Sequence, residues 1–292
     1  MYPSRFRYEA PRTLDEAIGL LHDGAGEAKV LAGGQSLVPL LRLRFAAPEL
    51  LVDINKLADL AYHHVAEDGT LRIGALCRHA DLEHSALLPG PHPTLAAAAP
   101  LISDPLVRNR GTLVGSLCHA DPQGDWASVV TSLDGGVIAV GPAGRRTIPI
   151  RDFVSGPFQN TLGFDEIAVE TVIPPALGER AGGYLKLERR VGDFATVGVA
   201  VSLELGPNAD ILRAGIALTG VGGATIDASK ASDVLRGAPL TASSIELAAN
   251  LAAEAARPRS DHRGSAEYKR HIVHTFVTRI MTRVSADLER AA

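Results

Sequence analysis

Apolar residues recur at three- and four-residue intervals near the C-terminal end of the chain. The set comprises Tyr268, Ile272, Val273, Phe276, Val277, Ile280, Met281 and Val284. This spacing places them on one face of a helix, so we predict a helix that packs one side against a core. Upstream, apolar runs at 184–188, 194–205 and 211–220 predict three strands, and we expect an antiparallel sheet.

The N-terminal part of the chain alternates short apolar runs with helical patterns. Thr13 and Glu16 form a capping-box pattern, which predicts a helix that continues through about residue 21. The elements predicted after it are a strand at 29–31, a helix at 37–44, strands at 50–54 and 71–75, and a helix at 78–85. The order strand, loop, helix and strand indicates a helical, partly parallel lobe.

The pattern changes near residue 135. Apolar runs at 137–140 and 147–150 are separated by Gly141-Pro142-Ala143-Gly144, which predicts an antiparallel hairpin and hence a second lobe. Pro174-Pro175 and Gly182-Gly183 bracket a boundary near residue 177. We therefore expect an α+β protein with two domains, 1–176 and 177–292.

Composition narrows the class of protein. The chain has 292 residues, 46% of them hydrophobic, a net charge of −4 and two cysteines. This charge gives no reason to expect nucleic acid or an anionic membrane as a partner. Two cysteines fit a reducing compartment and are too few for an iron–sulfur cluster. With no apolar signal sequence and no run long enough to cross a bilayer, we expect a soluble cytoplasmic protein.

Two glycine-bearing segments carry the candidate chemistry. The first contains Ala32, Gly33, Gly34, Gln35, Ser36 and Leu37, and the second contains Gly111, Thr112, Leu113, Val114, Gly115 and Ser116. Small residues let backbone N–H groups approach a phosphate, and a helix that follows favours an anion there. We expect Gly33 to leave room for the phosphate and to allow a positive φ. Either segment alone is also consistent with a tight turn, but the pair predicts a pyrophosphate site.

The chain resembles the FAD-binding medium subunits of molybdenum hydroxylases, such as carbon monoxide and xanthine dehydrogenases. AGGQSLVP at 32–39 and RNRGTLVGSLCHADPQGD at 108–125 match the family's two flavin-binding segments. Val114 stands where the family usually has glycine. GGYLKLERRVGDFATVGVAV at 182–201 and RPRSDHRGSAEYKRH at 257–271 extend the resemblance over nearly the whole chain.

The resemblance implies a fold, a cofactor and partners. The first domain would be a two-lobed FAD-binding domain of the vanillyl-alcohol-oxidase type, followed by a small antiparallel-sheet-plus-helices domain. FAD would bind non-covalently, with Asp125 on cofactor hydroxyls, Lys186 near the flavin's pyrimidine edge, and Ile102 and Leu162 as apolar contacts. A small [2Fe–2S] subunit would supply electrons, and a large subunit would carry molybdopterin. The assembly would be a dimer of heterotrimers, with NAD, a quinone or O₂ as the acceptor.

Several alternatives stay open at this point. Asp125 could cap a helix that starts near Trp126, and Lys186 could be an exposed strand lysine. Residues 220–225 follow a strand and are a weak nicotinamide-dinucleotide candidate, because they lack a third small residue in register and a ribose-binding acid. A stand-alone FAD-dependent oxidoreductase and a non-enzymatic flavin-binding protein are the other functional classes. We identify no catalytic acid–base set and no metal site, and we read His119 and Asp121 as part of a polar loop.

Overall fold

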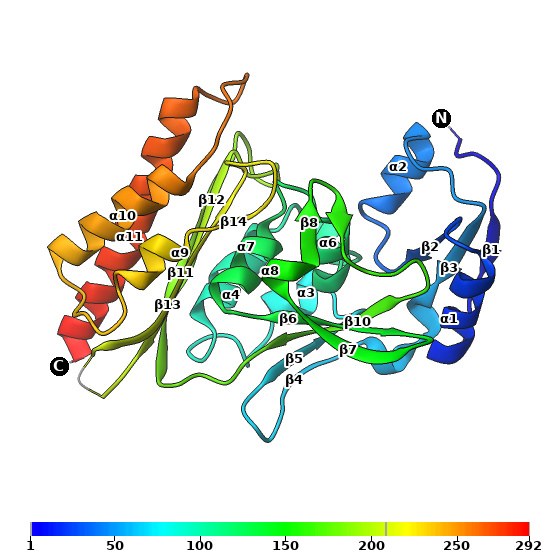
Figure 1. Ribbon diagram of the computed structural model, residues 1–292, viewed down its shortest axis with the longest axis horizontal. Helices are drawn as coiled ribbons and strands as arrows, with labels where there is room; N and C mark the ends of the chain where they lie inside the picture. Colours follow the sequence, from blue (N-terminus) through cyan, green and yellow to red (C-terminus); the bar gives the residue numbers. More distant parts are fainter. Residues whose placement is uncertain (1, 208, 292) are drawn as a thin grey trace.

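A three-stranded parallel sheet forms one end of the molecule. The computed structural model describes residues 2–207 and 209–291 (Figure 1). The sheet has the order β1 (Arg7–Glu9), β3 (Leu50–Asp53), β2 (Ala28–Leu31). Helix α1 (Leu14–Asp23) packs against β2 and β3, and α2 (Leu37–Leu43) connects β2 to β3. The predicted strand–loop–helix–strand unit is therefore confirmed. Thr13 caps α1 by accepting the Glu16 N–H, but the Glu16 carboxylate accepts from the Arg12 N–H rather than from Thr13.

A five-stranded antiparallel sheet occupies the middle of the molecule. Its order is β4 (His63–Val65), β5 (Leu71–Gly74), β10 (Ile167–Ile173), β6 (Gly136–Gly141), β7 (Gly144–Pro149). The predicted hairpin is β6–β7, with Val137 opposite Ile148. The antiparallel lobe begins earlier in the chain than residue 135, because the late strand β10 pairs with β5 on one side and with β6 on the other.

Short helices connect and cover these strands. They are η1 (Ile54–Lys56), η2 (Ala58–Leu60), α3 (His79–Glu83), α4 (Pro93–Ala98), η3 (Ala99–Leu101), α5 (Pro105–Arg108), α6 (Leu113–His119), α7 (Asp125–Ser132) and α8 (Ile150–Phe153), with the small hairpin β8 (Val154–Gly156) and β9 (Gln159–Asn160). Every residue of α7 is buried. This helix is therefore a central element rather than a surface connection.

The C-terminal part is an antiparallel sheet covered on both faces. Its strands, in order, are β11 (Glu179–Leu187), β12 (Val197–Leu205), β13 (Ile211–Thr219) and β14 (Ile226–Asp227). The helices that follow are α9 (Ser229–Asp233), α10 (Ala242–Ala255) and α11 (Ala266–Ala291). In Figure 1, α10 and α11 cover one face, while α4 and α7 lie on the other. All residues of β12 are buried, as expected for a sheet between two helical layers.

The sheet and the long helix confirm the prediction. Strand β11 begins at Glu179 rather than at Tyr184, so the Gly182-Gly183 pair lies inside it. A Cβ on Gly182 would lie 2.1 Å from the Val201 carbonyl oxygen, and one on Gly183 would meet the Arg283 guanidinium. Close packing therefore explains these glycines. None of the helices within 2–207 and 209–291 combines the length and apolar character that a membrane crossing requires.

The two faces of β11 serve two different cores. Tyr184 belongs to the core built around β5, β6, β10 and α7, whereas Leu185 and Leu187 pack on the core formed by β12, β13, α10 and α11. Successive side chains of a strand point to opposite faces, so β11 joins the two parts of the molecule.

Candidate cofactor-binding site

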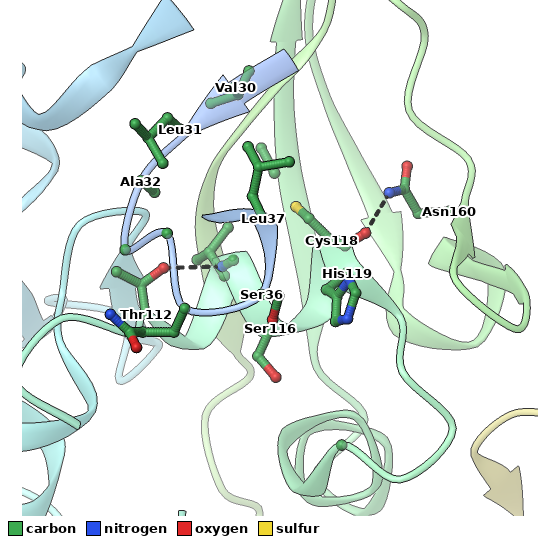
Figure 2. A pocket seen from close by; sticks show the side chains of 18 of the residues that line it. Val30, Leu31, Ala32, Ser36, Leu37, Thr112, Ser116, Cys118, His119 and Asn160 are labelled. Carbon is green, nitrogen blue, oxygen red and sulfur yellow. Dashed lines mark hydrogen bonds between the residues drawn. The ribbon is translucent and has the colours of Figure 1, made fainter. Parts of the chain in front are cut away.

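A single cavity of about 1200 Å³ gathers nearly all of the predicted site residues. It is lined by Ala32, Gly33, Gly34, Gln35, Ser36, Leu37, Ile102, Gly111, Thr112, Val114, Gly115, Ser116, Asp125, Leu162 and Lys186. Leu113 does not line it, because its side chain is fully buried in the core beneath α6. Residues far apart in the sequence therefore share one wall (Figure 2).

The first glycine loop connects β2 to α2. The amide N–H groups of Gly33, Gly34, Gln35 and Ser36 have no acceptor among the residues that the structure describes. Gly33, Gly34 and Ser36 are half-buried, and half-buried amides rarely remain without a partner. Four successive N–H groups on a cavity wall therefore form a site for an acceptor-rich ligand.

The second glycine loop runs into α6. Thr112 caps this helix, because its hydroxyl accepts the Gly115 N–H at 3.1 Å (Figure 2). The capping bond uses an oxygen lone pair, so the Thr112 hydroxyl hydrogen is still able to donate. Ser116 follows one turn later and also faces the cavity. The second loop thus contributes hydroxyl groups, whereas the first contributes amides.

The two loops touch each other at Gly33. A Cβ on Gly33 would lie 2.3 Å from the Arg110 carbonyl oxygen and 2.8 Å from the Gly111 Cα. Gly33 does not have a positive φ, whereas Gly34 has one of 76°. The close approach of the second loop therefore requires glycine at position 33.

Asn55 and Arg78 tie the loops together from behind. The Asn55 side-chain amide donates to the Ala32 carbonyl at 2.8 Å, and the Arg78 guanidinium donates to the Arg110 carbonyl at 2.6 Å. Arg78 also donates to the Asn55 side-chain oxygen at 2.6 Å. The pair holds one residue of each loop at a set separation. Neither residue lies in a glycine motif, so the sequence pattern did not predict this pair.

His79 lies against the second loop and was also missed. Its Nδ1 accepts the indole N–H of Trp126 at 3.0 Å, and a Cβ on Gly111 would lie 2.7 Å from its Nε2. Packing of the imidazole ring therefore requires glycine at position 111. Burial, with smaller contributions from Arg108 and Arg78, lowers the pKa of His79 to about 4. The ring is consequently neutral near pH 7.

Lys186 and Asp125 form a buried ion pair in the same cavity. The Lys186 Nζ donates to the Asp125 carboxylate at 3.0 Å and to the Leu101 carbonyl at 2.9 Å. The Lys186 side chain is 2% exposed, so the exposed-lysine alternative is wrong. The helix-cap alternative for Asp125 is wrong too, because Gly124 is the N-cap of α7 and Asp125 is its first residue.

Two further groups contact this pair. The Tyr184 hydroxyl donates to Asp125 at 2.6 Å, and the Glu188 carboxylate lies 3.5 Å from Lys186. Burial raises the pKa of Asp125, although Lys186 and Tyr184 act in the opposite direction. Two carboxylates therefore surround one ammonium, and the charge of Lys186 is compensated within the protein.

The remaining wall is apolar and aromatic. Ile102, 7% exposed, and the half-buried Leu162 line the cavity, and so do the more exposed rings of Phe158, Phe164 and Phe194. The family resemblance implies that the loop with Arg190, Asp193 and Phe194 faces the flavin ring, and Asp193 and Phe194 do line the cavity. Phe158 and Phe164 were not identified from the sequence, because isolated aromatic residues carry no motif. A planar apolar ligand group would find contacts on this side.

The structure excludes the alternative dinucleotide site. Residues 220–225 follow β13 in an antiparallel sheet and lead to no helix before α9, so they do not form a dinucleotide-binding βαβ unit. His119 is half-buried beside Phe158, and burial lowers its pKa. No group of three or more His, Cys, Asp or Glu residues suited to a metal occurs within 2–207 and 209–291.

Comparison with known proteins identifies a family for both parts of the chain. Residues 4–176 match the family described as FAD binding domain in molybdopterin dehydrogenase, and 183–284 match CO dehydrogenase flavoprotein C-terminal domain. The carbon monoxide dehydrogenase medium chain of Hydrogenophaga pseudoflava is 37% identical over 96% of this chain and 97% of its own. A 6-hydroxypseudooxynicotine dehydrogenase complex subunit alpha of Paenarthrobacter nicotinovorans is 36% identical over 97% and 95%.

A solved structure gives the same result in three dimensions. The structure of Hydrogenophaga pseudoflava carbon monoxide dehydrogenase lacking the Mo-pyranopterin moiety includes a chain that matches with a TM-score of 0.91. The match covers 97% of this chain and 98% of that one, at 37% identity. The two chains therefore share a fold over essentially their whole length.

Proposed function

Because this chain belongs to the family of FAD-binding subunits of molybdenum hydroxylases, we propose that it holds FAD in the cavity described above and passes electrons between a partner's [2Fe–2S] cluster and an external acceptor. The acceptor would be NAD, a quinone or O₂. A bound flavin supplies the ability to exchange electrons singly or in pairs. The protein's own residues bind the cofactor, orient it and set its surroundings.

The observation that carries this proposal is the meeting of two kinds of site in one cavity. The four unpaired amides of Gly33 to Ser36 suit a pyrophosphate, while the apolar wall near Lys186 suits an aromatic ring. The cavity volume of about 1200 Å³ exceeds that of most small-molecule pockets, which supports a dinucleotide rather than a mononucleotide. The residues present therefore fit FAD.

Each wall has a proposed task. The first-loop amides and the hydroxyls of Thr112 and Ser116 would donate to the pyrophosphate. Ile102 and Leu162 would pack on the ring system. Asp125 and Lys186 would face the polar parts of the flavin, with their mutual ion pair already formed.

We also propose that the chain works inside a complex. Its relatives include a carbon monoxide dehydrogenase medium chain and a dehydrogenase complex subunit. Its two cysteines, Cys77 and Cys118, are too few for an iron–sulfur cluster. The partners would be a small [2Fe–2S] subunit and a large molybdenum subunit, assembled as a dimer of heterotrimers.

The first experiment tests the cofactor. The purified full-length chain should be yellow with about one flavin per chain, and acid precipitation should release all of the colour. The released flavin should migrate as FAD on chromatography. Colour that stays in the pellet would contradict non-covalent binding, and recovered FMN would contradict the dinucleotide.

The second experiment tests the subunit role. The purified chain should not turn over aldehydes, N-heterocycles or CO with an artificial acceptor. Co-expression with its genomic neighbours should yield a complex in which substrate bleaches the flavin absorbance. Robust turnover by the chain alone would favour the stand-alone oxidoreductase instead.

A further inference from the structure

His79 has a ring nitrogen for which residues 2–207 and 209–291 provide no hydrogen-bond partner. The side chain is 4% exposed, yet it lines the cavity. Its Nδ1 is occupied by the Trp126 indole N–H, which donates at 3.0 Å. Because an indole only donates, Nδ1 has to be the unprotonated nitrogen, and the single hydrogen of the neutral ring is on Nε2. Among the described residues, Nε2 has no acceptor.

The position of this donor is specific. Nε2 lies against Gly111, which in turn lies against Gly33. The His79 backbone N–H also donates to the Gly111 carbonyl at 3.0 Å, which holds the ring beside the second loop. The Nε2–H therefore lies at the junction of the two glycine loops.

We propose that His79 is a positioning residue for the dinucleotide, and that its Nε2–H donates to a pyrophosphate oxygen held where the two loops meet. The inference rests on the proposed FAD function and adds a residue outside both glycine motifs. Trp126 acts through His79, because its indole N–H selects the tautomer with hydrogen on Nε2. The low pKa of His79, due mainly to burial, agrees with a neutral ring that donates from one nitrogen only.

Three variants separate donation from packing. Gln places an amide nitrogen near the position of Nε2 and can donate, whereas Leu fills space without a donor. We expect His79→Leu to weaken FAD binding between about 10-fold and 100-fold, the effect of one hydrogen bond to a charged group. His79→Gln should bind close to wild type, and Trp126→Phe should weaken binding because the tautomer is no longer selected.

His92 provides a matched control. It is also buried, its pKa is also lowered to about 4 by burial, and its Nδ1 bonds to Arg180 at 2.9 Å. It does not line the cavity. His92→Leu should therefore lower thermal stability without changing the FAD dissociation constant measured by flavin fluorescence.

Two further measurements complete the test. ADP carries the pyrophosphate without the flavin ring, so its affinity should fall by a similar factor in His79→Leu; a loss confined to FAD would overturn the pyrophosphate assignment. Side-chain ¹H–¹⁵N NMR of the wild-type chain should show His79 protonated on Nε2, with a shift on adding FAD, which decides the matter even if His79→Leu fails to fold. An Nδ1–H tautomer, equal affinity in His79→Leu, or a His79→Gln variant as weak as His79→Leu would overturn the inference. Failure of the wild-type chain to bind FAD would instead refute the proposed function itself.

Discussion

The two ends of the cavity differ in the groups that form their walls: backbone amides at one end and charged side chains at the other. At the loop end, backbone amides and small residues from 32–36 and 111–116 form the wall, and the groups there are neutral. At the other end, the ammonium of Lys186 on β11 lies within 3.5 Å of the carboxylates of Asp125 on α7 and Glu188, the residue after β11. The loop end is specified by contiguous motifs, whereas the charged end exists only after residues 61 positions apart have come together. FAD binding should therefore be sensitive to atoms added at the loop end. Folding stability should be sensitive to the loss of a counter-charge at the charged end.

Gly33→Val should have the largest effect, at the loop end. The added side chain would enter the space of the Arg110 carbonyl, 2.3 Å from the Cβ position, and push the two loops apart. We expect FAD to bind about 100-fold more weakly or not at all, as measured by flavin fluorescence titration. Gly19→Val on α1 is the control, because a Cβ there meets no atom within 4 Å. Wild-type affinity in Gly33→Val would show that the first loop is not a phosphate site.

Lys186→Met should have the next largest effect, at the charged end. It would leave the Asp125 carboxylate buried without its cation, which costs about 3 kcal/mol or more of unfolding free energy. Adding Asp125→Asn should restore part of the loss, because the neutral amide needs no counter-charge. Denaturant unfolding of the two single variants and the double variant measures the coupling. Strictly additive losses would mean that the pair is not coupled in the folded protein.

Asn55→Ala should weaken the loop end without adding atoms to it. The variant loses the bond to the Ala32 carbonyl and the contact with Arg78, so the two loops are no longer tied. We expect FAD affinity to fall by about 10-fold, the effect of roughly one hydrogen bond. Asn250→Ala is the matched control, since Asn250 bonds only to Glu246 on α10 among the contacts of the described residues. Unchanged FAD affinity in Asn55→Ala would show that the loops hold their separation without this pair.

Val114→Gly should have the smallest effect on binding. Val114 lines the cavity and supplies a backbone N–H whatever its side chain, so FAD affinity should stay the same or improve. Stability should fall by about 2 kcal/mol, because a buried side chain is lost and glycine is flexible in a helix. Leu113→Ala gives the contrast, since Leu113 is buried outside the cavity. A large loss of affinity in Val114→Gly, beyond that of Leu113→Ala, would mean that the valine side chain itself holds the ligand.

Much of the fold follows from local pattern. Strands β2, β3 and β5, the hairpin β6–β7, the C-terminal sheet and α11 all have the expected apolar periodicity. Strand β10 was not predicted. It is buried on both faces and pairs with strands far from it in sequence, so it has no alternating pattern to reveal it.

The site divides in the same way. The glycine loops can be identified from the sequence, because small residues at fixed spacing are unusual. The roles of His79, Asn55 and Arg78 cannot be identified in this way, because they arise only from tertiary contacts. These contacts are with Gly111, Ala32 and Arg110, respectively. The structural reasons for two of the glycines could not be predicted from the sequence either. Gly33 makes room for the second loop, and Gly111 makes room for the imidazole ring of His79.

The two faces of strand β11 should differ in their tolerance to mutation. Arg180, Tyr184 and Lys186 bond to His92 and Asp125 in the first part of the chain, while Ala181, Leu185 and Leu187 pack toward the C-terminal helices. A saturation scan along β11 should therefore alternate with a period of two residues. Substitutions at Tyr184 and Lys186 would be expected to be selected against because they alter the flavin site, and those at Ala181, Leu185 and Leu187 because they lower protein abundance, so that neighbouring residues of one strand evolve under separate constraints.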